Sequence, residues 1–139
     1  MYLNGEKIGE IGIDAAIVGE IGKKVIMVSG DDKACAEAKA FLPDVVTCEV
    51  KKGLNSFGAM LLPREKAHKL IFEKTVEAVK NAQKVQPYQV EHPVEITVEQ
   101  MERLLLPNSV RDPEMEILDA RTYKVTGATV EEAFYKAMS

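Results

Sequence analysis

The sequence predicts an α/β fold: a partial parallel sheet with crossover helices over residues 1–50, followed by a smaller α+β lobe with antiparallel strands over residues 51–139. Two observations predict it. Residues 1–50 alternate between short apolar runs and helix-spaced apolar positions, a pattern that favours parallel strands joined by right-handed crossovers. After Lys51 the alternation gives way to short paired strands and amphipathic helices, which is typical of an antiparallel sheet with helices on one face.

The first part begins with a short extended segment and then alternates. Its expected elements are an extended segment at 2–8 with a turn at Asn4-Gly5, a helix at 9–21 ended by Gly22, a strand at 24–30, a helix from Asp31 or Asp32 to Pro43, and a strand at 44–50. The helix at 9–21 is apolar on two faces, so it should be buried nearly all round. We expect its cover to come from a partner chain or from a self-associating edge at the first strand.

The second part has two helices with capping signatures. Its expected elements are a loop or short extended segment at 51–61, a helix from Pro63 to Gln83, a linker at 86–93, a strand at 94–97, a helix at 97–106 capped by Thr97 with Gln100, strands at 114–120 and 122–127, and a helix at 129–138 capped by Thr129 with Glu132. These residues are expected to form a lobe separate from residues 1–50.

Charge and composition exclude several classes of protein. The net charge is −4 and no stripe of lysine and arginine occurs, so nucleic acid is not an expected partner. No run of about 18 apolar residues is present, so no membrane span is expected. Cys35 and Cys48 are too few for a disulfide framework. We expect both to be small core residues of a protein in the reducing cytoplasm.

Motifs for nucleotides and for histidine-based metal centres do not occur. The turn after the first strand reads "GEIGID", which does not match the G-x-G-x-x-G fingerprint of dinucleotide sites. His68 lies on the expected long helix and His92 in the linker, and neither has a partner at metal-ligand spacing. We expect His68 to face solvent.

Glu10 is the most informative carboxylate, because it stands between Gly9 and Ile11 at the start of a buried helix. One interpretation is a favourable charge at the positive end of the helix dipole. The other is a metal ligand that points into a crevice at the carboxyl edge of the sheet. Spacing alone leaves both open. The motif "GEIG" recurs at 19–22, about 2.8 helical turns later, so its two copies do not share a face; we interpret the repeat as chance and the second copy as a helix end.

Three stretches together resemble a known family. These are "YLNGEKIGEIGIDAAIVGEIG", "VIMVSGDDKACAEA" and "LPDVVTCEVKKGL", in this order. They resemble the second half of the bacterial zinc-dependent D-aminopeptidases associated with dipeptide-transport operons. The similarity is strongest over residues 2–54 and continues more loosely through "LLPREKAHKLI". Its most diagnostic parts are the N-G-x-x-(I/V)-G-E-(I/L)-G turn and the V-x-G-D-D strand end.

The resemblance implies a two-zinc peptidase that releases N-terminal D-amino acids from short peptides and forms ring-shaped homo-oligomers. The glutamate of the G-E-(I/L)-G motif is a zinc ligand in that family, and here it falls on Glu10. Residues 1–50 would then be the C-terminal part of a catalytic domain. The sequence also departs from the family: Asp14 stands where relatives often have Asn, and Ser56 where an Arg is expected in many members.

The family's remaining ligands, an Asp-x-Glu-Gly motif and histidines, and its proposed catalytic histidine have no counterpart in these residues. We therefore assign no catalytic residue, leave the substrate-binding residues unknown, and expect no zinc on this chain alone, because zinc sites need three or four protein ligands. The leading hypothesis is the C-terminal portion of such an enzyme, inactive alone and completed by a missing N-terminal half. A non-catalytic assembly or binding module is the alternative. A self-sufficient enzyme that uses Glu10 with Asp31 or Asp32 is a third.

Overall fold

The structure, a computed structural model, describes residues 1–103, 106–107 and 113–139. Its contacts divide the chain into two compact units, one made of residues 1–21 and 89–139 and the other of residues 22–88. The predicted boundary at residue 50 concerns parts of a larger catalytic domain and stays a prediction. The fold class is confirmed as mixed α/β, with one parallel strand pair in the second unit and an antiparallel sheet in the first.

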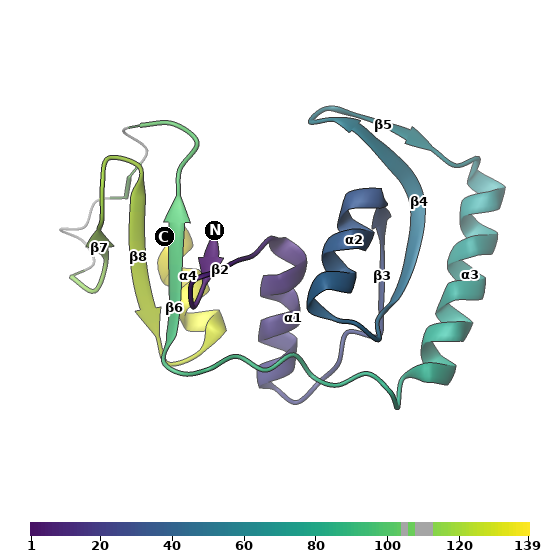
Figure 1. Cartoon of the computed structure of the whole chain (residues 1–139), viewed down its shortest axis with the longest axis horizontal. Helices are drawn as coiled ribbons and strands as arrows, with labels where there is room; N and C mark the ends of the chain where they lie inside the picture. Colours follow the sequence, from purple (N-terminus) through teal and green to yellow (C-terminus); the bar gives the residue numbers. More distant parts are fainter. Residues whose placement is uncertain (104–105, 108–112) are drawn as a thin grey trace. The chain divides into compact units, whose positions relative to one another are not determined.

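The first unit is a five-stranded antiparallel sheet in the order β2-β1-β6-β8-β7. Its elements are β1 (Tyr2–Leu3), β2 (Glu6–Lys7), α1 (Glu10–Glu20), β6 (Val94–Glu99), β7 (Glu116–Ile117), β8 (Thr122–Gly127) and α4 (Val130–Met138). Helix α4 packs on the long strands β6 and β8, and α1 contacts α4 (Figure 1). The carboxyl-terminal helix therefore joins the sheet to the helix that carries Glu10.

Alternating side chains build the core of the first unit. Val94 and Ile96 of β6 are fully buried, and Ile96 lies opposite Val125 of β8. Because side chains along a strand alternate between faces, the apolar residues of both strands meet on the face that α4 covers. Gly127 is required where β8 approaches α4, since an added Cβ would lie 2.5 Å from the backbone nitrogen of Ala133.

The second unit is a three-stranded sheet in the order β3-β4-β5. Its elements are β3 (Met27–Asp31), α2 (Asp32–Phe41), β4 (Val46–Asn55), β5 (Gly58–Leu61) and α3 (Arg64–Asn81). Strands β3 and β4 are parallel and are connected through α2, as predicted, whereas β4 and β5 form an antiparallel hairpin. Helices α2 and α3 cover opposite faces of the β3–β4 pair (Figure 1).

Several local predictions are confirmed. Asn4 and Gly5 both have positive φ, 47° and 83°, which is the conformation of a tight two-residue hairpin turn. Gly22, with φ 69°, follows the end of α1. Thr129 accepts a hydrogen bond from the Glu132 backbone N–H (3.1 Å), and the Glu132 carboxylate accepts one from Ala128 N–H (2.9 Å), so the predicted capping signature of α4 forms.

Other predictions are wrong. The extended segment at 2–8 does not join the parallel strands β3 and β4; it forms the β1–β2 hairpin, which pairs antiparallel with β6 and leaves β2 at the edge of the sheet. The helix predicted at 97–106 does not begin at Thr97, which lies within β6 and pairs with Lys124 of β8. Pairing with β8 overrides the local capping signature there. Residues 104–105 of that helix lie outside the described residues, as do residues 108–112 before β7.

The remaining differences between prediction and structure concern the length of the β4–β5 hairpin and the burial of α1. The segment at 51–61, expected as a loop or short extended segment, forms the outer part of the β4–β5 hairpin. Helix α1 is buried along Gly12, Ile13, Ala15, Ala16 and Gly19. Glu10 and Asp14, four residues apart, are exposed and form a polar strip on an otherwise apolar helix. The expectation of burial nearly all round is therefore wrong, because Ile17 and Val18 are only half-buried and Ile21 is 69% exposed.

Candidate functional site

Glu10 is the first residue of α1, and the residues just before it are held in place by burial and by backbone hydrogen bonds. Ile8, just before it, is buried at 5% exposure, and its N–H donates to the Met1 carbonyl (3.0 Å). Gly9 is the N-cap, in extended conformation with φ −104° and ψ −168°, and its carbonyl accepts from Ile13 N–H (3.2 Å). The β1–β2 hairpin and Ile8 therefore position the start of the helix.

The Glu10 carboxylate is available to a ligand. Glu10 is exposed, and within residues 1–103, 106–107 and 113–139 its side chain makes no observed hydrogen bond or ion pair. Gly9 supplies no capping side chain, so the first N–H groups of α1 are left to solvent, to Glu10 or to a bound group. The positive end of the helix dipole favours a negative charge at this position. Both interpretations of Glu10 are consistent with this geometry.

A second carboxylate stands at the other end of α1. Glu20 Oε2 accepts from the backbone N–H of Val130, the first residue of α4, at 2.9 Å. Its Oε1 lies 3.5 Å from His92 Nε2, and His92 Nδ1 lies 2.9 Å from the Ala128 carbonyl oxygen. The Glu20 side chain is only 15% exposed. The second "GEIG" copy thus provides a carboxylate that caps another helix, a role that its spacing did not reveal.

The pair Asp31-Asp32 has structural partners. Asp31 Oδ1 caps α2 by accepting from the N–H groups of Lys33 (3.1 Å) and Ala34 (2.8 Å), as predicted for one residue of the pair. Asp32 Oδ1 accepts from Gly53 N–H on β4 (2.9 Å), and this hydrogen bond holds the pKa of Asp32 below its ordinary value. Lys33 Nζ donates to the Gly53 carbonyl (3.3 Å). The strand end of the V-x-G-D-D motif therefore fastens β4 to the start of α2.

The two cysteines and His68 lie in the environments that the sequence predicts for them. Cys35 and Cys48 are free and buried, at 8% and 1% exposure, and burial raises the pKa of the Cys35 thiol. His68 is exposed on α3. His92, which carried no assigned role, contacts Glu20 and Ala128 as described above.

The described residues do not fit a complete zinc centre. Among them no group of three or more His, Cys, Asp and Glu residues is placed to hold a metal ion. Catalytic zinc takes three protein ligands and structural zinc takes four. The described residues therefore gather no such set of ligands around Glu10, and no reaction step is assigned to them.

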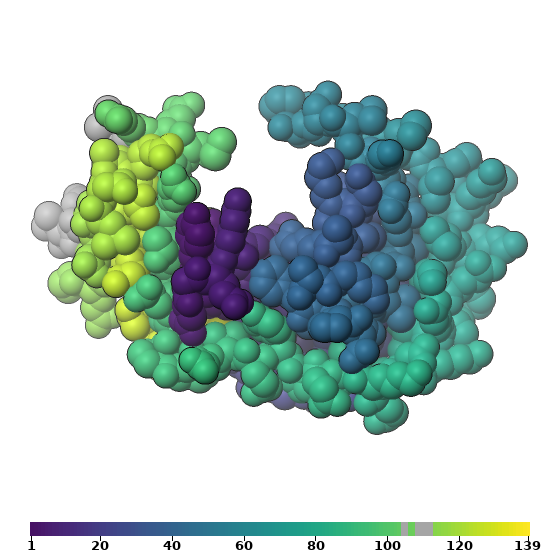
Figure 2. Space-filling model, in the orientation of Figure 1, coloured from purple at the N-terminus to yellow at the C-terminus, as the bar shows by residue number. Residues whose placement is uncertain are grey.

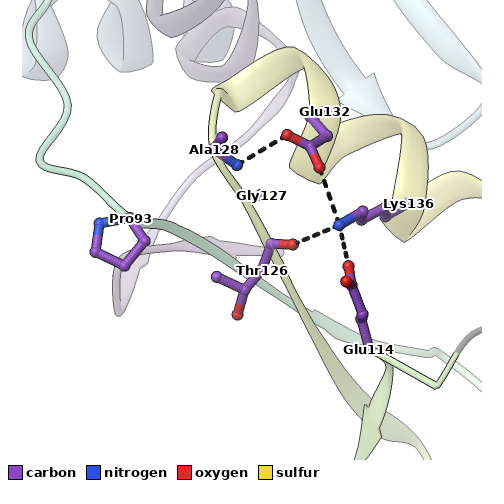
Figure 3. A pocket seen from close by; sticks show the side chains of 7 residues that line it. All are labelled: Pro93, Glu114, Thr126, Gly127, Ala128, Glu132 and Lys136. Carbon is purple, nitrogen blue, oxygen red and sulfur yellow. Dashed lines mark hydrogen bonds and ion pairs between the residues drawn. The ribbon is translucent and has the colours of Figure 1, made fainter.

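A surface hollow of the first unit offers no alternative centre. It is lined by Pro93, Glu114, Thr126, Gly127, Ala128, Glu132 and Lys136 (Figure 3). Lys136 Nζ contacts Glu114, Glu132 and the Thr126 carbonyl, and the two carboxylates raise the pKa of Lys136. An ammonium group has three N–H donors, and these three acceptors account for all of them. The hollow is therefore held together by its own charges.

No helix of the described part is long and apolar enough to cross a bilayer.

Three comparisons with known proteins agree with one another. The peptidase M55 family of D-aminopeptidases matches residues 1–139. A D-aminopeptidase of Bacillus subtilis (strain 168) is 38% identical over 86 residues, which are 62% of this chain and 31% of that protein. The solved structure of the zinc-dependent D-aminopeptidase DppA from Bacillus subtilis, described as a self-compartmentalizing protease, superposes with a TM-score of 0.90 at 30% identity.

The structural match extends over nearly the whole chain but not over the whole relative. It covers 99% of this chain and 50% of DppA, so the chain spans about half the length of that relative. The resemblance carried by the "GEIG" and "VSGDD" stretches is thus confirmed by sequence and by fold. The chain belongs to the peptidase M55 family of D-aminopeptidases.

Proposed function

We propose that this chain is the C-terminal portion or a subunit of a zinc-dependent aminopeptidase that releases N-terminal D-amino acids from short peptides. Its contribution to the active centre is the Glu10 carboxylate, one ligand of the metal site. The observation that carries the proposal is the position of Glu10: an exposed carboxylate at the amino-terminal end of α1, in a chain whose family is that of the D-aminopeptidases.

The geometry supports a ligand role in two ways. A metal ligand must be ionised, and the helix amino terminus favours negative charge. A ligand must also be held in place, and α1 is held at both ends, by Ile8 before it and by the Glu20–Val130 hydrogen bond after it. The remaining ligands belong, in this proposal, to a complementary N-terminal half, because the described residues gather no set of three.

Reconstitution tests the proposal. The chain is mixed with the N-terminal half of the Bacillus subtilis relative, and hydrolysis of D-Ala peptides is followed with zinc and after chelation. We expect the pair to hydrolyse the peptide only with zinc, and each half alone to be inactive. Glu10→Gln should abolish the activity, whereas Asp14→Asn, an exposed carboxylate one turn along α1, should retain it. A pair that folds and associates but stays inert with zinc would refute the catalytic role.

An assembly role is the second candidate. A non-catalytic module derived from this family is favoured by the lack of a three-ligand cluster among the described residues, and the relative DppA is described as self-compartmentalizing. Stable self-association of the chain, together with an inactive reconstituted pair, would select this role. For either role we place the protein in the cytoplasm, where a reducing environment suits two free buried cysteines.

A further inference from the structure

The β4–β5 hairpin exposes apolar side chains and an open backbone edge. Strand β5 is the last strand of its sheet. Around it, Phe57 is 103% exposed, Met60 60% and Leu61 70%, and residues 57–62 read "FGAMLL" without a charge. Figure 2 shows the hairpin at the molecular surface in blue to teal. Uncharged apolar edge strands of this kind pair with another chain unless something covers them.

The direction of the free backbone groups follows from the hairpin register. Leu62 N–H donates to the Val50 carbonyl (3.0 Å), so this pair exchanges hydrogen bonds across the hairpin. Antiparallel pairs alternate between hydrogen-bonded and non-hydrogen-bonded, and Leu61 lies opposite Lys51 while Ala59 lies opposite Gly53. The N–H and C=O groups of Ala59 and Leu61 therefore point away from β4, toward the open edge.

We propose that β5 pairs antiparallel with β5 of a second copy of this chain, with Met60 of both copies on the two-fold axis. In this register Ala59 of each copy lies opposite Leu61 of the other, so the four outward groups of each strand edge are matched by four on its partner. The same patch serves both copies, which is the requirement for a closed two-fold interface. The inference rests on the proposed function, in which the chain is the C-terminal portion or a subunit of an enzyme of this family.

The position of Lys52 and the surroundings of β3, the other edge of the sheet, both favour a second copy of this chain as the partner of β5. Lys52 is opposite Met60 on β4, so the two copies of Lys52 would be three strand spacings apart, about 14 Å, beyond the Debye length at physiological salt. Strand β3, the other edge of the sheet, lies between the helical layers of α2 and α3, a place where an α/β sheet is extended by further parallel strands. The hairpin continues past the end of the β3–β4 pairing at Lys51.

Cysteine crosslinking tests the register directly. Cα atoms of a non-hydrogen-bonded antiparallel pair lie about 4.5 Å apart, within the range that a disulfide spans. Met60→Cys should therefore form a disulfide-linked dimer on mild oxidation, seen on a non-reducing gel. Met101→Cys, at a site that is 91% exposed and distant in sequence, is the matched control and should stay largely uncrosslinked. Cys35 and Cys48 are buried and do not compete.

A second variant tests the backbone pairing. Ala59→Pro removes one outward N–H, and proline is tolerated at an edge position whose N–H faces solvent. We expect the dissociation constant of the chain's self-association to rise about tenfold or more with unchanged circular dichroism, because two of the four intermolecular hydrogen bonds are lost. Crosslinking of Met60→Cys no stronger than that of Met101→Cys, or unchanged association of Ala59→Pro, would overturn the inference. If the reconstituted enzyme is active in either case, the proposed function stands without it.

Discussion

The Glu20 carboxylate caps the amino terminus of α4 by accepting a hydrogen bond from Val130 N–H at 2.9 Å, across 110 residues of sequence. One carboxylate oxygen is used in this way, and the other lies beside His92. The contact joins the carboxyl end of the helix that begins with Glu10 to the last helix of the chain. The placement of the proposed metal ligand thus depends on residues near the carboxyl terminus.

Removal of this cap should destabilise the first unit. Glu20→Ala leaves the Val130 N–H without its acceptor, and loss of a helix cap costs about 0.5–2 kcal/mol. Glu20→Gln keeps a carbonyl oxygen at the same place and should lose less. Urea unfolding followed by circular dichroism measures both, with the exposed Glu6→Gln as control. Equal stability of Glu20→Ala and the wild type would show that the cap is unimportant.

A buried hydroxyl fastens β8 to α4. Tyr123 is 2% exposed and its Oη donates to the Ala137 carbonyl at 2.5 Å, while burial raises the pKa of the Tyr123 phenol. Tyr123→Phe leaves that carbonyl, near the helix end, without this donor, and we expect a loss of about 1–2 kcal/mol in unfolding free energy. Tyr135→Phe, 66% exposed on the same helix, is the matched control and should be neutral. Similar values for the two variants would contradict this account.

The approach of β8 to α4 makes Gly127 hard to replace. An added Cβ would lie 2.5 Å from Ala133 N and 2.9 Å from its Cα and Cβ, so strand and helix would have to separate. We expect Gly127→Ala to cost about 1–3 kcal/mol by overpacking. Gly58→Ala, where the nearest atom is Asn55 Oδ1 at 3.4 Å, should change stability little. Thermal unfolding of the two variants distinguishes them, and a Gly127→Ala variant as stable as Gly58→Ala would argue against the close packing.

The contact between Asp32 and Gly53 should be pH-dependent. The Gly53 N–H stabilises the Asp32 carboxylate and lowers its pKa below the ordinary value of 3.8. A carboxyl with a lowered folded-state pKa contributes stability above its unfolded-state pKa and loses that contribution as the pH falls through the folded-state pKa. The wild type should thus exceed Asp32→Ala in stability at neutral pH, and the difference should shrink below pH 3.8.

Denaturant unfolding of the two proteins across this pH range gives the measurement. Asp44→Ala, at an exposed site between α2 and β4, is the control and should alter stability little at any pH. A difference between wild type and Asp32→Ala that is the same at neutral and acid pH would show that the carboxylate charge is not what holds Gly53.

Local signals in the sequence predicted the features that local interactions determine. Asp31 and Thr129 cap helices through N–H groups two or three residues away, and Asn4-Gly5 turns within its own hairpin. Such contacts are visible in a short window of sequence. The same kind of signature failed at Thr97, because Thr97 pairs with Lys124 in a neighbouring strand and no local rule includes that partner.

The site was predicted in part for the same reason. Glu10 was chosen as a candidate by its position in a glycine-flanked motif and by resemblance to a family that the comparisons confirm, and its role as a metal ligand stays a prediction. Glu20 was not identified, since its partner Val130 is 110 residues away. The role of Asp32 was also missed, because it depends on Gly53 in β4. Whether Glu10 holds a metal depends on groups that the described residues do not bring together.

Zinc titration tests the central claim most directly. The chain alone, the chain with the complementary N-terminal half of the Bacillus subtilis relative, and the same pair carrying Glu10→Gln or Asp14→Asn are each titrated calorimetrically. The account predicts no tight stoichiometric zinc binding by the chain alone, tight binding by the pair, and a marked loss of affinity with Glu10→Gln but not with Asp14→Asn. Tight stoichiometric binding by the solitary chain, or a pair whose zinc affinity is indifferent to Glu10→Gln, would contradict it.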